Sequence, residues 1–300
     1  MKNKIYAILI ILAGVFWGSS CLFVNKLSAI GFSSMHCTAI RIIIAAIILN
    51  CALIIKGKGF SYNKISATSW LIAVISGICS VLAMCLFYYA CILQTSAAVS
   101  AILLYTAPIF VMIMSVIFFK EKVTVKKVFA LALAVVGCAL VSGILTGMTV
   151  NAVGIVFGIL SGFAYSLYGI LTAFFMKKNS EPLTFSALSF IFAAIGALLI
   201  CDTPTIIATV AAQSGIPLLL GSFVLFSLCS AVIPFALYTK GLVGVRPDVA
   251  SILAFAEPLT AALMGILVLS QPFYVYQGVG MAFIVVAIII LNVHPKKKKK

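Results

Sequence analysis

The sequence predicts an all-α integral membrane protein whose ten transmembrane helices form two inverted five-helix repeats. Hydrophobic residues make up 64% of the 300 residues and charged residues only 8%, whereas soluble domains carry about 25% charged residues. Apolar runs repeatedly approach the roughly 20 residues that a bilayer-spanning helix needs. The second half also repeats landmarks of the first half. Ten-residue alternating strands, the pattern of membrane barrels, are absent, so we expect a helical bundle.

The apolar runs place five helices in each half of the chain. In the first half they are Ile5 to Val24, Ala39 to Ile55, Trp70 to Leu93, Ala97 to Phe119 and Val125 to Leu145. In the second half they are Ala152 to Met176, Thr184 to Ile200, Pro217 to Val243, Pro247 to Leu269 and Tyr274 to Asn292. The first run is too long for a secretory signal and no small-residue cleavage site follows it, so it counts as a helix.

The two halves are related by adding 150 to the residue number. Pro108 then falls on Pro258 and Tyr105 on Phe255. Five spans per unit is an odd number, so the second unit enters the membrane from the opposite side. Inverted repeats of this kind place a transporter's substrate site near the bilayer midplane. We therefore expect one repeat over residues 5–145, a second over residues 152–292, and a basic tail over residues 293–300.

The distribution of basic residues predicts the orientation, because cytoplasmic loops collect Lys and Arg. With the N-terminus inside, all of the 20 basic residues except Lys26 and Arg41 lie on the cytoplasmic side. Both termini are then cytoplasmic, in a plasma membrane of the bacterial inner-membrane type. The net charge of +15 is explained by short loops beside anionic lipids, so we expect no nucleic-acid partner.

The sequence lacks the residue patterns that metal binding, redox chemistry and nucleotide binding require. The nine cysteines show no metal or redox spacing, and no phosphate-binding Gly-Lys-Ser/Thr sequence is present. The only histidines, His36 and His294, lie at opposite ends of the membrane span. We therefore expect no metal, no cofactor and no enzymatic activity.

Glu257 is the only acidic residue expected in the interior of a helix. It lies ten residues after Pro247, hence about 15 Å along a helix. Its helix carries small residues on the same face, and these permit close contact with other helices. Three interpretations stay open: Glu257 braces the backbone that Pro258 frees, holds an amino group of a substrate, or carries a proton, since burial favours the neutral form of a carboxyl group.

Aromatic and hydroxyl side chains deep in the helices are the other candidates for a substrate site. The candidate substrate-binding residues are Trp17, Ser20, Tyr88, Tyr105, Tyr165, Tyr238, Phe255 and Glu257. Plain packing explains the aromatic residues equally well, provided that their NH and OH groups find partners. Pro108 and Pro258 bend their helices, either as fixed kinks or as a pair of hinges.

Two charged segments have simpler interpretations. Arg41 begins the second helix on the outer side, where it reaches the lipid headgroups or, as the alternative, attracts a carboxylate. Lys120, Glu121 and Lys122 lie in an inner loop, where exposed ion pairs contribute at most about 1 kcal/mol.

These residues together resemble the EamA-type transporters of the drug/metabolite transporter superfamily. The resemblance rests on Trp17-Gly-Ser-Ser20, Arg41, Leu104-Tyr-Thr-Ala-Pro108, Glu121 and Ala256-Glu-Pro258. It covers two units, Ile8 to Ser142 and Val153 to Leu291. It implies a bacterial inner-membrane carrier without a cofactor, many such carriers being exporters of amino acids or related metabolites. Gln271 departs from the pattern, because the resemblance implies a second acid there.

The sequence therefore predicts a secondary transporter that exports an amino acid or a related small metabolite by alternating access. The alternatives are uptake or exchange of a nucleoside-like or vitamin-like compound, and a lipid-handling membrane protein. The expected partners are a small-molecule substrate, membrane lipids and, as an open question, protons. A monomer and a homodimer are both compatible with the sequence.

Overall fold

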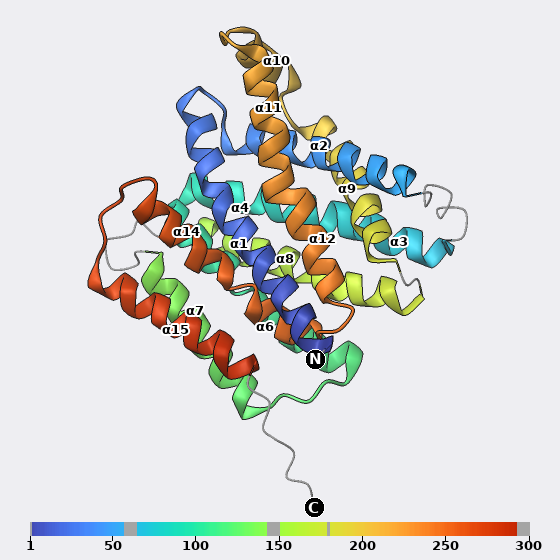
Figure 1. Ribbon diagram of the computed structural model, residues 1–300, viewed down its shortest axis with the longest axis vertical. Coiled ribbons are helices and arrows are strands. Elements are labelled where there is room, and N and C mark those ends of the chain that lie inside the picture. The colour runs from blue at the N-terminus through green and yellow to red at the C-terminus, as the bar shows by residue number, and fades with distance from the viewer. Residues whose placement is uncertain (1, 57–64, 143–150, 179–180, 293–300) are drawn as a thin grey trace, which may run out of the picture.

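The computed structural model describes residues 2–56, 65–142, 151–178 and 181–292, and no strand occurs among them. Helices lie at all ten expected positions, so the all-α prediction is confirmed (Figure 1). Within those ranges, eight helical stretches are long and apolar enough to cross a membrane, and Val275–Leu291 is a shorter apolar helix. The predicted end of the first repeat at residue 145 and the basic tail over residues 293–300 lie outside the described residues.

Each half of the chain contributes helices in the same order. The first half contains α1 (Lys2–Ala29), α2 (Ser34–Ile55), α3 (Ala67–Ile75), the π-helical turn η2 (Ser76–Leu82), α4 (Ala83–Gln94), α5 (Ala97–Leu104), α6 (Ala107–Phe119) and α7 (Val125–Val141). The second half contains α8 (Ala152–Lys178), α9 (Pro182–Ile200), α10 (Thr203–Ala211), α11 (Ile216–Ser227), η4 (Leu228–Val232), α12 (Ile233–Gly241), α13 (Pro247–Leu253), α14 (Ala256–Leu267) and α15 (Val275–Asn292).

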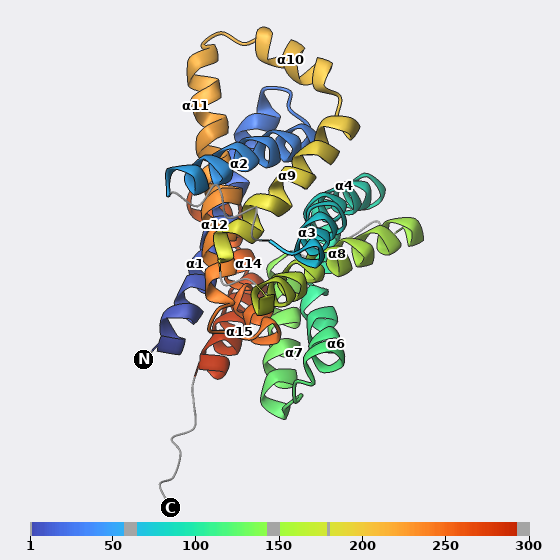
Figure 2. The same ribbon diagram turned by 90° about the vertical axis from the view of Figure 1, so that its right-hand side faces the viewer.

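The short helix α10 was not expected from the sequence. It connects α9 to α11 at the upper end of the bundle (Figure 2). Asp202 caps it by accepting a hydrogen bond from the Thr205 N–H at 3.1 Å, and a proline in the first turn favours a helix start. None of its residues is buried, and nine residues are too few to cross a bilayer.

Helix α2 begins five residues before the expected start. The Ser33 side chain accepts a hydrogen bond from the His36 N–H, and the His36 ring accepts one from the Ser33 N–H, which is a capping box. The expectation that Arg41 begins this helix is therefore wrong. Arg41 lies two turns inside it.

The two repeats share details of the backbone, not only their order of helices. The turns η2 and η4 overlap when 150 is added to the residue number. Lys120 and Ser270, also 150 apart, both adopt the left-handed conformation with a φ of 53°. The next residues, Glu121 and Gln271, both donate a backbone hydrogen bond six residues back along the chain. The repeat is therefore visible in local geometry, although few of its residues are identical.

Both prolines interrupt their helices, as predicted. The break before Pro108 separates α5 from α6, and the break before Pro258 separates α13 from α14. A proline lacks an N–H and clashes with the carbonyl group four residues earlier, which belongs to Leu104 and Ala254 respectively. Each break therefore lies just before its proline, at Tyr105 and Phe255.

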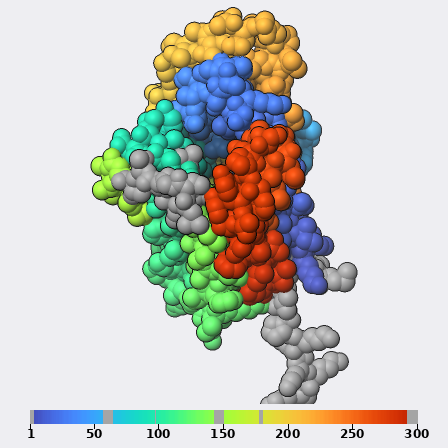
Figure 3. All heavy atoms as spheres, turned by 90° about the vertical axis from the view of Figure 1, so that its left-hand side faces the viewer, coloured from blue at the N-terminus to red at the C-terminus, as the bar shows by residue number. Residues whose placement is uncertain are grey.

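Helices of one repeat pack largely against helices of the other. α1 contacts α12 and α14, and α8 contacts α4, α5 and α6 in the corresponding way. α2 pairs with α9, and α7 pairs with α15 along one face of the molecule (Figure 3). The first helix of each repeat therefore lies among the helices of the opposite repeat, and the centre of the bundle is a junction between repeats.

Glycines allow α1 to approach α14 closely. A Cβ atom on Gly18 would lie 2.7 Å from the Thr260 Cβ and 2.9 Å from the Ala261 nitrogen. Gly14 faces the same helix, with Ala256 Cβ at 2.9 Å from a Cβ in that position. Small residues permit such contacts between membrane helices, and this contact positions the start of α14.

Replacing Gly18 with Ala should destabilise the folded protein by about 1–3 kcal/mol, because overpacking moves α1 away from α14. The melting temperature of the purified protein in detergent should fall accordingly. Gly221→Ala is the matched control, since a Cβ atom there meets nothing within 4 Å. Equal melting temperatures for the two variants would contradict the close packing described for α1.

Candidate functional site

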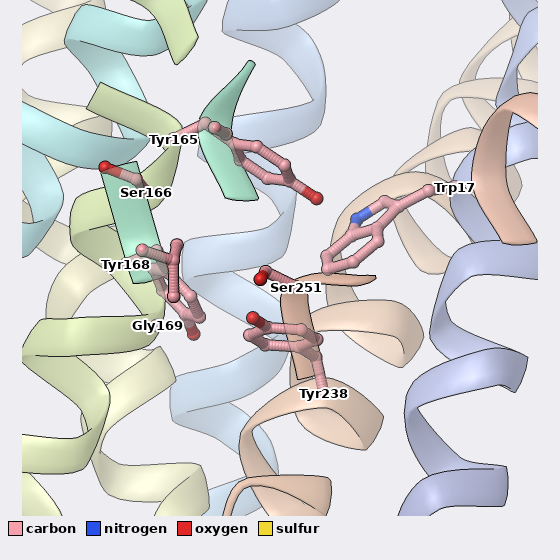
Figure 4. A pocket seen from close by; sticks show the side chains of 9 residues that line it. Trp17, Tyr165, Ser166, Tyr168, Gly169, Tyr238 and Ser251 are labelled. Atoms are coloured by element: carbon pink, nitrogen blue, oxygen red, sulfur yellow. The ribbon is translucent and has the colours of Figure 1, made fainter. Parts of the chain in front are cut away.

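Aromatic side chains from three helices surround a small cavity at the junction of the repeats. Trp17 comes from α1, Tyr165 and Tyr168 from α8, and Tyr238 from α12 (Figure 4). The Trp17 ring centroid lies 6.3 Å from that of Tyr165 and 5.5 Å from that of Tyr238. Three of the predicted site residues thus share one cavity wall.

The cavity is too small for a metabolite in this structure. Its volume is about 20 Å³. That is room for about one water molecule, whereas small-molecule pockets usually measure about 300–1,000 Å³. The aromatic side chains therefore fill the space between the repeats, and a ligand would have to displace them.

Glu257 lies in the first turn of α14, directly after the proline-associated break. The side chains of Tyr105, Tyr165 and Arg41 lie close enough to its carboxyl group to interact with it electrostatically. Tyr88 belongs to the same group, because it lies within electrostatic range of both Glu257 and Arg41. Tyr165 lines the aromatic cavity too, so the carboxyl group lies next to that cavity.

Positions related by the repeat meet at the centre of the bundle. The rings of Tyr105 and Phe255, which are 150 residues apart, lie 5.5 Å from each other. Trp17 and Tyr165, matched at an offset of 148, are also neighbours. Ser20 lies one turn further along α1 and does not line the cavity.

Sequence reasoning missed a buried cluster of hydroxyl groups behind the cavity. The Tyr168 hydroxyl lies 3.0 Å from Ser186 Oγ and 3.0 Å from Thr239 Oγ1, which are themselves 3.0 Å apart. Thr239 donates its own proton to the Phe235 carbonyl at 2.6 Å. The Tyr168 hydroxyl therefore has hydrogen-bond partners within the protein. The aromatic ring of Tyr168 is the part of the side chain that is left to contact a molecule in the cavity.

A charged cluster joins the two repeats at the end of the bundle where α6 ends and α13 begins. Lys127 and Asp248 form a buried salt bridge with side-chain exposures of 6% and 2%. Arg246 pairs with Glu121 and lies 3.9 Å from Asp248. Two expectations are therefore wrong: Glu257 is not the only acid buried in a helix, and Glu121 is not an exposed loop residue.

The local sequence explains why these charges are buried. Pro247 begins α13 and Asp248 occupies its first turn, where a carboxylate is stabilised by free N–H groups and the helix dipole. Asp248 accepts a hydrogen bond from the Val249 N–H at 2.8 Å. Lys127 also donates to the Lys122 carbonyl at 3.1 Å. No sequence motif indicates that Lys127 pairs with Asp248, because the two residues lie in different repeats.

The helical bundle, the inverted repeats and the junction between them define a multi-pass membrane transporter. The profile of the EamA-like transporter family matches residues 4–143 and 152–293. The chain therefore belongs to the EamA-like transporter family.

Individual relatives support the same class. The chain is 25% identical over 300 residues to the uncharacterized transporter YwfM of Bacillus subtilis, covering 100% of this chain and 97% of the relative. It is 32% identical over 216 residues to an uncharacterized transporter of Archaeoglobus fulgidus, covering 68% and 70%. It is 26% identical over 298 residues to the uncharacterized inner membrane transporter YicL of Salmonella typhimurium, covering 97% and 96%.

A solved structure has the same fold. A protein known by its crystal structure, 15% identical to this chain, superposes with a TM-score of 0.75 over 96% of each chain. At that identity the similarity concerns the fold alone.

Replacing Asp248 with Asn should destabilise the protein by about 3–5 kcal/mol, because the Lys127 ammonium group would stay buried without an anion. Glu121→Gln is the control, since its partner Arg246 is 53% exposed and such pairs contribute about 0–1 kcal/mol. The free energy of unfolding in detergent should be measured for both variants.

The double variant Lys127→Met/Asp248→Leu should recover most of the lost stability, because it removes both charges together. If Asp248→Asn proves as mild as Glu121→Gln, the salt bridge does not hold the repeats together in the way described here.

Proposed function

We propose that this protein is a secondary transporter that exports a small organic metabolite, an amino acid or a related compound, by alternating access. The observation that carries the proposal is the position of Glu257 beside an aromatic cavity at the junction of two inverted repeats. Transporters with such repeats bind substrate near the bilayer midplane, often at interrupted helices. α14 begins at such an interruption.

The amino-acid class is favoured by the chemistry of the lining. Glu257 offers one negative charge to an amino group, and the tyrosine hydroxyls of Tyr105 and Tyr165 lie beside it. The aromatic rings of Trp17 and Tyr238 offer faces to an apolar side chain. A strongly anionic substrate would need several basic residues in this region.

Alternating access would require the repeats to separate at one end and close at the other. We propose that the charged cluster of Lys127, Asp248, Arg246 and Glu121 closes one end in this structure. The breaks before Pro108 and Pro258 are the proposed hinges, because the backbone is already interrupted there. Under this proposal the protein carries its substrate unchanged, as a transporter and not an enzyme.

Glu257 has three possible roles in this scheme: a substrate ligand, a proton carrier, or a brace for the backbone at the break. Its carboxyl group faces the Tyr105 and Tyr165 side chains, which favours the first two roles over the third.

In proteoliposomes, the native protein should exchange at least one labelled amino acid by counterflow. Glu257→Gln should lower that exchange by roughly tenfold or more if Glu257 binds the amino group, because an ammonium ion bound there would lose its anion. If Glu257 carries the proton, the variant should keep exchange and lose the response to a pH gradient.

Asp202→Asn is the control, since Asp202 is an exposed cap on α10. Counterflow that is silent for every amino acid but active for a nucleoside or vitamin would move the substrate class to those compounds. If the folded protein exchanges none of these amino acids, nucleosides or vitamins, a role in lipid handling is favoured.

We also propose that the protein lies in a bacterial-type inner membrane with both termini in the cytoplasm, as monomer or homodimer. A green fluorescent protein fused after residue 300 should fluoresce, because it folds in the cytoplasm, and a fused alkaline phosphatase should be inactive. Active phosphatase at the C-terminus would reverse the orientation. The same fusions after residue 213, on the opposite side, should give the reciprocal result.

A further inference from the structure

Arg41 lies inside helix α2, and its side chain reaches across to α4. It is the eighth residue of α2, so about 10 Å of helix separates it from the helix start. Its side chain is partly buried, and its Nη2 atom donates a hydrogen bond to the Cys85 sulfur on α4 at 3.2 Å. Charged residues within membrane helices are costly and usually mark a site. Headgroup contact does not explain the hydrogen bond to another helix.

The guanidinium group of Arg41 has little to bind within the described ranges. A guanidinium offers five N–H donors, whereas a thiol is a weak acceptor. None of the ion pairs among those residues involves Arg41, although Lys127 and Arg246 both have carboxylate partners. Donors therefore remain for a group that the protein itself does not supply.

Arg41 and Glu257 both lie near Tyr88. Cys85 and Tyr88 are three residues apart on α4, so they lie on one face of that helix. Tyr88 is within electrostatic range of both Arg41 and Glu257. The two charged groups attract each other without forming a direct ion pair. A positive and a negative group with a tyrosine beside them are thus held apart.

The repeat shows that this arrangement occurs once. The counterpart of Glu257, 150 residues earlier, is Ala107, and the counterpart of Arg41 at the offset of α2 and α9 is Ser189. Architecture alone would place similar residues in both repeats. The repeat architecture therefore does not require this pair of charges.

We propose that Arg41 binds the carboxylate of the substrate while Glu257 binds its ammonium group, so that the substrate is a small zwitterion. This inference rests on the proposed transport function and narrows its substrate class. Arg is suited to the carboxylate because its planar fork matches the two oxygens. A compound with only one of the two charges would leave the other protein charge unpaired.

The test is competition in proteoliposomes that contain the full-length protein and exchange labelled L-leucine, L-threonine, L-phenylalanine or L-lysine. For each amino acid that the native protein exchanges, the unlabelled amino acid should compete roughly tenfold or more strongly than its amide or its decarboxylated amine. Arg41→Gln should abolish this preference, and Arg41→Lys should keep part of it because the charge remains. Lys26→Gln is the control, since Lys26 is an exposed basic residue of α1.

The outcomes separate this proposal from the proposed function. Equal competition by the amino acid and its amide, or a preference that survives in Arg41→Gln, would overturn the role of Arg41 and leave transport standing. Absence of exchange for all four amino acids by folded native protein would overturn both this proposal and the amino-acid assignment in the proposed function. Because Arg41→Gln can fail to fold, the melting temperature of the native protein in detergent provides a second measurement. It should rise more with the exchanged amino acid than with its amide, and equal shifts would contradict the proposal.

Discussion

The constraint on which the rest of the structure depends is that a chain in hydrocarbon must satisfy its own backbone hydrogen bonds. It explains why the apolar runs are helices, and it restricts where a helix can be interrupted. The breaks before Pro108 and Pro258 occur at Tyr105 and Phe255, whose rings are buried against each other at the centre of the bundle. Irregular backbone is thus confined to the protein interior, where neighbouring helices surround it. The same confinement places the N-terminal end of α14, with Glu257 in its first turn, beside the cavity.

The backbone of the two repeats is symmetric, whereas the charged side chains differ between the repeats. The paired breaks, the paired π-helical turns and the left-handed residues Lys120 and Ser270 follow the repeat closely. The charged residues do not follow it. Glu257 corresponds to Ala107 and Glu121 to Gln271, so each acid occurs in one repeat only. Under the proposed function, the substrate site needs different groups at its two ends, and different residues on equivalent helices would supply them.

Much of the fold follows from local sequence, and the site follows only in part. Helix positions and the repeat depend on apolar runs and on prolines, which sequence displays directly. The inward position of Glu257 also followed, because a charge ten residues into a membrane helix has to face protein. The depth of Arg41 did not follow, since it depends on a capping box between Ser33 and His36 that contains no apolar signal.

The pairing of Lys127 with Asp248 was equally invisible, because the partners come from different repeats and meet only in the folded bundle. The helix α10 was missed because it is too short to register as an apolar run. For Arg41 and for the Lys127–Asp248 pair the missing information concerned side-chain partners, whereas apolar periodicity indicates only which segments leave water.

The charged cluster makes the two ends of the transporter chemically unequal. Adding or subtracting 150 converts Glu121, Lys127, Arg246 and Asp248 into Gln271, Gln277, Ser96 and Ala98, all neutral. Gln277 bonds to backbone groups, donating to the Val141 carbonyl at 3.3 Å, where its counterpart Lys127 bonds to a carboxylate. Separating the repeats at the charged end removes partners from buried ions, which costs several kcal/mol per ion unless water enters. At these four positions, separation of the neutral end would expose amide and hydroxyl groups in place of ions, each costing far less. Opening at the charged end must therefore admit water to Lys127 and Asp248 at the same time as the repeats part.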